Sequence, residues 1–77
     1  MKAKYKHREL DCIVYDQVIC EDNIVVTVRT FKGHYKANPE TFVKVCSTNA
    51  VAHRVFSKIC AKFDKAGYEC EYAVIRI

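Results

Sequence analysis

The sequence predicts an α+β fold, in which a small antiparallel sheet of three to four strands carries one helix on one face. Two patterns indicate this class: apolar side chains recur at helical spacing over residues 49–66, and they alternate as in a strand over residues 24–32. The length of 77 residues leaves room for one domain, and a hydrophobic content of 51% is enough for a compact core. We therefore expect the order β-β-β-α-β in a single domain, 1–77.

The first two expected strands form a hairpin. Residues 10–20 are rich in β-branched and aromatic types, which favour strands. Ile24 to Lys32 is the clearest strand, and the polar residues 21–23 before it are typical of a turn. The two segments are thus predicted to pair antiparallel. Residues 1–8, with Lys2, Lys4 and Lys6 among them, are expected to be a flexible basic segment.

Residues 39–46 allow two interpretations. Asn38-Pro39 could cap and begin a helix that runs on into the following segment. Against this, residues 41–46 are mostly β-branched or aromatic, and Ser47, Thr48 and Asn49 offer a new helix cap. We favour a third strand over residues 41–46.

The helix is predicted from Asn49 to Ala66, with either Thr48 or Asn49 as its N-cap and Gly67 as its C-terminal stop. Its apolar face repeats every four residues and is expected to cover the sheet. One flank of the helix is basic, with a stripe made of Arg54, Lys58, Lys62 and Lys65. Residues 68–77 end in an apolar run, which predicts a last strand within or beside the sheet.

The composition excludes several functions. Two glycines are too few for a phosphate-binding or dinucleotide-binding loop, and no catalytic constellation stands out, so we do not expect an enzyme. The five cysteines have no close C-x2–4-C spacing, which argues against zinc and predicts free thiols; no cofactor is expected. No segment has the length of a membrane span, and no apolar signal region follows the basic start, so a cytoplasmic location is expected.

The candidate site comes from strand periodicity. If Val26 and Val28 face the helix, Arg29 and Phe31 point to the other side of the sheet, which a single helix leaves open. By the same alternation, Phe42 and Lys44 of the third strand and Tyr72 and Arg76 of the last strand are expected to point to this open side. The predicted sheet-face site consists of Arg29, Phe31, Phe42, Lys44, Tyr72 and Arg76.

Two functions fit such a surface. A small protein-binding module, such as a viral or mobile-element inhibitor that occludes its partner, would use the aromatic residues as anchors. Alternatively, a small basic domain with a net charge of +4 would bind nucleic acid through cations and stacked rings, on the sheet face and on the helix stripe. A second copy of the chain is a further candidate cover for the open face. We place the protein-binding module first and nucleic acid second.

Overall fold

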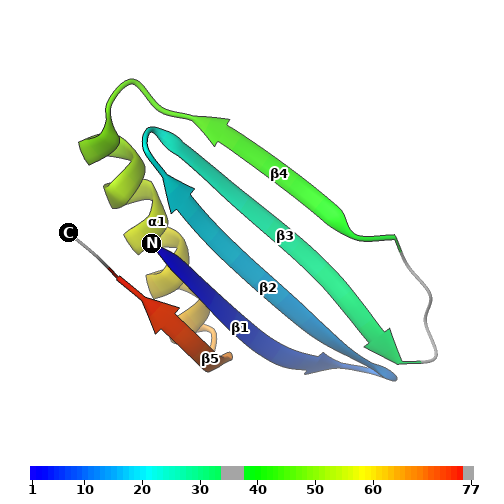
Figure 1. Cartoon of the computed structure of the whole chain (residues 1–77). Coiled ribbons are helices and arrows are strands. Elements are labelled where there is room, and N and C mark those ends of the chain that lie inside the picture. Colours follow the sequence, from blue (N-terminus) through cyan, green and yellow to red (C-terminus); the bar gives the residue numbers. More distant parts are fainter. Residues whose placement is uncertain (34–37, 76–77) are drawn as a thin grey trace.

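The computed structural model describes residues 1–33 and 38–75. Its strands form one antiparallel sheet in the order β4-β3-β2-β1-β5, and the helix packs against one side of it (Figure 1). The α+β class is thus confirmed, but the sheet has five strands rather than three to four. The elements are β1 (Lys2–Glu9), β2 (Cys12–Glu21), β3 (Ile24–Gly33), β4 (Glu40–Val45), α1 (Asn49–Lys65) and β5 (Glu69–Val74).

The additional strand is the N-terminal one. The expectation of a flexible segment over residues 1–8 is wrong, because Lys2–Glu9 form β1, which pairs with β2 on one side and β5 on the other. Basic residues alternate here with Ala3 and Tyr5, whose side chains are buried in the core. Such alternation is the pattern of a half-buried strand. The basic segment is therefore an interior strand of the sheet.

The predicted hairpin of the next two strands is confirmed. β2 and β3 pair antiparallel from Glu21↔Ile24 outward, across a turn in which Asp22 takes a left-handed conformation with φ of +54°. Aspartate tolerates that conformation better than most residues do. This register sets Cys20 opposite Val25 and so decides which side of β3 meets the helix.

The interpretation of residues 41–46 as a strand is also confirmed. β4 (Glu40–Val45) pairs antiparallel with β3, so the alternative of a helix beginning at Pro39 is wrong. Asn23 binds the backbone of Cys46, directly after β4, in two ways. Its side-chain amide donates to the Cys46 carbonyl at 2.8 Å, and its backbone carbonyl accepts from the Cys46 N–H at 2.7 Å.

The helix ends lie where the sequence predicts them, to within one residue. Thr48 is the N-cap, and its hydroxyl accepts from the N–H of Val51 at 3.1 Å. At the other end, Gly67 has φ of +82° and the N–H of Tyr68 donates to the carbonyl of Phe63 at 3.1 Å. Tyr68 also stacks on Phe63, so the C-terminus is a Schellman motif with its usual apolar contact. This turn leads the chain directly into β5.

The core lies between α1 and one side of the sheet. Ala52, Phe56 and Phe63 are the buried helix residues, and they pack on buried side chains of the first three strands. All residues of the two edge strands, β4 and β5, are exposed. Within the described residues, no helix is long and apolar enough to cross a membrane. Because α1 packs on one side of the sheet, the other side has no covering layer among the residues that the structure describes (Figure 1).

Candidate binding face

The side of the sheet that faces away from α1 is called the open face here. Its residues follow from the register, because side chains directly opposite each other on neighbouring strands point to the same side. Lys4 lies opposite Gln17 of β2 and Tyr72 of β5, and Gln17 lies opposite Val28 of β3. Since Ala3 and Tyr5 point into the core, this line of residues points away from it.

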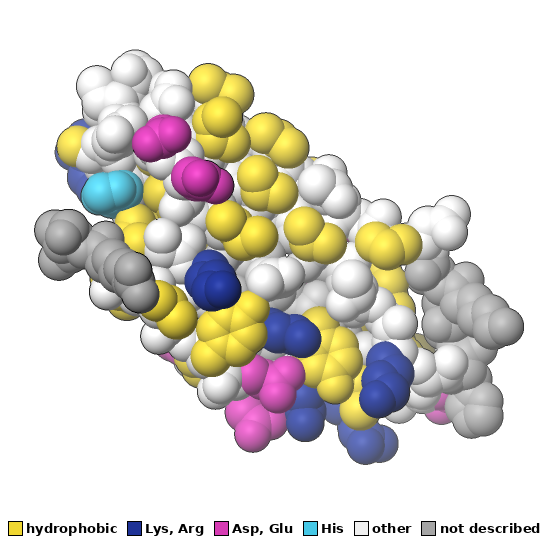
Figure 2. Space-filling view, viewed as in Figure 1, with side chains coloured by type: hydrophobic (Ala, Val, Ile, Leu, Met, Phe, Trp, Pro, Cys, Tyr) yellow, Lys and Arg dark blue, Asp and Glu magenta, His cyan; other side chains and the backbone are white. Residues whose placement is uncertain are grey.

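Aliphatic side chains gather on one half of the open face, across β2, β3 and β4. Figure 2 shows them as a continuous apolar group. Val26 lies opposite Val43 and Ile24 opposite Val45, and the two β4 valines are 63% and 68% exposed. We call this surface the aliphatic patch. It consists of Ile19, Ile24, Val26, Val28, Val43 and Val45.

Two shallow hollows adjoin the patch, and Ile19 lines both. The smaller, about 190 Å³, is bounded by Ile24 and Val26, with Glu21 and Asp22 at its rim. The larger, about 400 Å³, lies toward Lys2 and Val74 and includes Ile19 in its lining. The smaller hollow is lined by the patch residues Ile19, Ile24 and Val26, so the aliphatic patch is not flat at this point.

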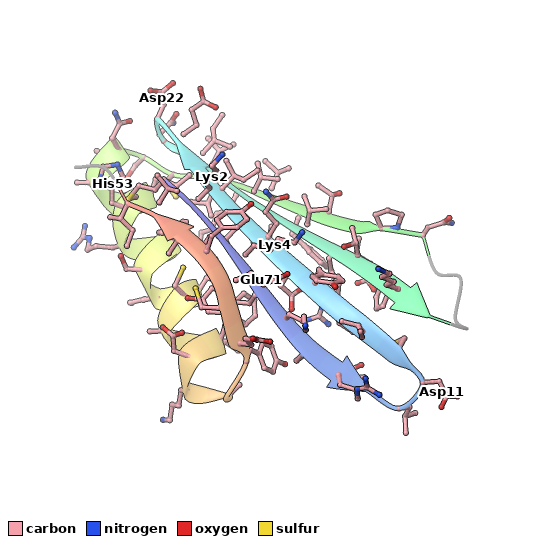
Figure 3. All side chains as sticks on the ribbon, turned by 60° about the horizontal axis from the view of Figure 1, so that its bottom comes forward. Lys2, Lys4, Asp11, Asp22, His53 and Glu71 are labelled. Atoms are coloured by element: carbon pink, nitrogen blue, oxygen red, sulfur yellow. The ribbon has the colours of Figure 1, made fainter. Side chains whose placement is uncertain are left out.

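Cations occupy the other half of the open face. Alternate residues of β1 point outward and form what we call the basic row, which consists of Lys2, Lys4, Lys6 and Arg8. Figure 3 shows the side chains of Lys2 and Lys4 one after the other along β1. Figure 2 shows Lys and Arg side chains interleaved with large apolar side chains in this part of the surface.

Two tyrosines flank the basic row. The Lys4 ammonium lies 4.8 Å from the ring centre of Tyr15 on β2, within the range of a cation–π contact. On the β5 side, the amide of Gln17 donates to the hydroxyl of Tyr72 at 2.7 Å, across β1. Lys6 lies 3.6 Å from the carboxylate of Glu69. The basic row is therefore bordered by two aromatic rings, each of which contacts a neighbouring side chain of the open face.

The residues predicted as one sheet-face site do not all lie on the same side of the sheet. Arg29, Phe31, Phe42 and Lys44 do share one side of β3 and β4, but it is the helix side. The prediction assumed that Val26 faces the helix. In the structure Val25 packs in the core instead, because the hairpin register sets it opposite the buried Cys20. Tyr72 does lie on the open face, and Arg76 lies outside the described residues.

Arg29 has a structural partner on the helix side. Its guanidinium binds the carboxylate of Asp16, which is only 1% exposed, at 2.8 and 3.3 Å. This hydrogen bonding raises the pKa of the Arg29 guanidinium. Next to the pair, the imidazole of His7 stacks on Tyr68 at 3.9 Å and its Nε2 lies 3.0 Å from Glu9. Because Tyr68 also stacks on Phe63, this group of side chains lies beside the C-terminal end of α1.

The helix stripe predicted from the sequence is solvent-exposed at all four positions, Arg54, Lys58, Lys62 and Lys65. It belongs to the helix layer and so lies on the opposite side of the sheet from the basic row. Its role in binding stays a prediction.

The thiols add no metal site. All five cysteines are free, and the described residues contain no group of three or more acidic, histidine or cysteine side chains placed to hold a metal ion. Burial raises the pKa of the Cys20 and Cys60 thiols, which favours their protonated form.

The chain matches no protein-family model, no curated protein and no solved structure. The basic row is what the sequence reasoning missed. The sequence does contain a pattern that indicates this row. Basic residues recur there at the two-residue period of a strand, at Lys2, Lys4, Lys6 and Arg8. The alternation predicts a strand with one basic side, whereas the charge content alone suggested a tail.

Proposed function

We propose that this protein is a non-enzymatic binding module that docks another protein on the aliphatic patch. The observation that carries the proposal is the pair of β4 valines, Val43 and Val45, which stand 63% and 68% exposed on the edge strand and continue an apolar group from β3 on the side of the sheet that faces away from α1. Contiguous exposed apolar surface is uncommon on monomeric proteins, and it usually marks a contact with another molecule.

The chemistry of the patch indicates the chemistry of the partner. Aliphatic side chains from three neighbouring strands form its centre, and charged groups such as Glu21 and Asp22 stand only at its rim. An apolar centre with a polar rim is the usual arrangement of a protein interface. The partner therefore presents apolar side chains, one of which fits the hollow beside Ile24 and Val26.

We expect the open face to act by covering part of the surface of its partner. The first three strands of the sheet pack on α1 through the core, so the open face is formed by the fold itself, within a particle of 40 × 23 × 16 Å. A folded surface that docks on a partner prevents other molecules from reaching the same part of that partner. Inhibition or regulation by occlusion is therefore the mode of action that we propose.

Adjacent residues of β4 provide a matched test. Val43 and Phe42 are equally exposed, at 63%, but they point to opposite sides of the sheet. A photo-crosslinking amino acid at position 43 is expected to capture a partner in cells that contain the protein, and the same group at position 42 is not. Val26→Lys, placed in the same chain, is expected to abolish capture at position 43, because the lysine puts a charge at the apolar contact.

The outcomes separate the alternatives. Equal capture at positions 42 and 43, or capture at 43 that Val26→Lys does not reduce, would contradict docking on the aliphatic patch. A crosslinked product of twice the mass of the chain, with light scattering that shows a dimer, would identify a second copy as the occupant and contradict a distinct partner.

A further inference from the structure

The basic row lies beside the aliphatic patch, and protein docking on the patch does not use it. We propose that the basic row, together with Tyr15 and Tyr72, is a second binding site on the open face, and that its ligand is a single strand of nucleic acid. The site is carried by β1 and its two neighbours in the sheet, β2 and β5.

The first argument is the geometry of the cations. Lys2, Lys4, Lys6 and Arg8 project from alternate positions of one extended strand, so they form a straight line that spans about 20 Å. Positive charges along a line match a linear polyanion better than they match a compact ligand. A nucleic-acid backbone with a phosphate at every nucleotide is such a polyanion.

The second argument is the position of the aromatic rings. Tyr72 of β5 stands opposite Lys4 and Tyr15 of β2 stands opposite Lys6, so the tyrosines lie on the two sides of the cation line. A backbone that follows β1 can place its bases over these rings. Stacking on aromatic side chains next to a positive groove is how proteins hold single strands without sequence preference.

The third argument is preorganisation. The Gln17 amide holds the hydroxyl of Tyr72 at 2.7 Å, and the ammonium of Lys4 lies against the ring of Tyr15 at 4.8 Å. Rings fixed before binding lose less conformational entropy when a base stacks on them. Base faces are accessible only where the strand is unpaired, so the tyrosines favour a single strand over a duplex.

The direct test is fluorescence anisotropy of labelled single-stranded and duplex oligonucleotides, DNA and RNA, over a range of salt concentrations. Saturable binding of single strands that weakens with salt is expected. The double variant Lys4→Gln with Lys6→Gln is expected to reduce the slope of log K against log salt by about 0.7 per lysine. Lys58→Gln with Lys62→Gln removes the same charge from the helix stripe on the other side of the sheet, so it compares the two candidate surfaces. A site on the basic row predicts a much smaller loss for this pair than for Lys4 and Lys6.

The tyrosine is tested separately from the charges. Tyr72→Ala is expected to weaken binding by about 5- to 150-fold, as loss of one stacked base does, while Tyr72→Phe keeps the ring and is expected to stay close to the parent. Glu69→Gln is expected to tighten binding severalfold, because Glu69 lies 3.6 Å from Lys6 and opposes the phosphates. Circular dichroism of each variant checks that the fold is retained.

The results that would overturn the proposal are specific. Absence of binding at low salt, equal losses for the two lysine pairs, or a duplex bound as tightly as a single strand would each exclude this site. Val43→Lys tests whether the two sites are independent. It places a charge in the aliphatic patch, which is expected to prevent protein docking there, and it is expected to leave the affinity for nucleic acid unreduced. The proposed protein docking and the proposed nucleic-acid site can thus fail separately.

Discussion

Arg29 on β3 and Asp16 on β2 lie directly opposite each other, and the guanidinium binds both oxygens of the carboxylate, at 2.8 and 3.3 Å. The Asp16 side chain is almost entirely removed from solvent, whereas that of Arg29 remains 34% exposed. A buried carboxylate is costly unless it is paired and hydrogen-bonded. The register places both residues on the helix side of the sheet, and the pair gives the buried carboxylate its hydrogen-bond partner there.

Replacing the arginine tests this structural role. Arg29→Leu is expected to lower the free energy of unfolding by about 1–3 kcal/mol, because it leaves Asp16 buried without its partner. Urea denaturation followed by circular dichroism measures the change. Arg54→Leu, at an exposed position of α1, is the control and is expected to stay within about 0.5 kcal/mol of the parent. Equal effects of the two substitutions would contradict the pairing.

The orientation of α1 makes a second prediction. Phe56 is 1% exposed at the centre of the core, whereas Ile59 is only partly buried beside it. Phe56→Ala is expected to cost about 3–5 kcal/mol of unfolding free energy, and Ile59→Ala distinctly less, because the smaller truncation at a half-exposed site leaves a smaller cavity. Chemical denaturation of both variants gives the comparison. A larger cost at Ile59 would mean that the helix is rotated from the orientation described.

Alkaline pH is expected to destabilise the protein. Burial raises the pKa of the Cys20 and Cys60 thiols in the folded state. Stability from a raised pKa is complete below the unfolded value, about 8.5 for cysteine, and is lost as the pH rises toward the folded value. The melting temperature should therefore fall from about pH 8.5 upward. Cys20→Ala should have a shallower fall than the parent over the same range.

A control thiol separates burial from other alkaline effects. Cys70 stands exposed on β5, so Cys70→Ala changes a cysteine without removing a buried thiol. If this variant flattened the pH dependence as much as Cys20→Ala does, burial of the thiols would not be the cause.

Sequence periodicity located most elements but not the faces of the sheet. The helix and the hairpin were predictable because each combines a repeat with its own stop signals, Thr48 and Gly67 for the helix and the polar residues 21–23 for the turn. The side of β3 was not predictable, because Ile24, Val25 and Val26 place aliphatic residues on both faces. Only the pairing across the turn, which sets Cys20 opposite Val25, settles the choice.

The candidate site was missed for a related reason. Its cations come from the N-terminal strand, where the number of charges is typical of a solvated tail and only the burial of Ala3 and Tyr5 between them makes the segment a strand of the sheet. The pairing of β1 with both β2 and β5 depends on contacts far apart in the sequence. Local patterns do not determine such contacts, so the meeting of Lys4, Tyr15 and Tyr72 emerges only from the assembled sheet.

The turn between β1 and β2 gives a final prediction. Leu10 there is 97% exposed and has φ of +44°, a left-handed conformation that is unfavourable for a bulky residue. Asparagine adopts it more readily, so Leu10→Asn is expected to raise the free energy of unfolding by about 0.5–1 kcal/mol. Leu10→Ala removes the exposed side chain but keeps the unfavourable backbone preference, and it is expected to match the parent. Urea denaturation measures the free energy of unfolding of the parent and both variants. Equal increases for Leu10→Asn and Leu10→Ala would mean that exposure of the leucine side chain, and not its backbone conformation, limits stability at this turn.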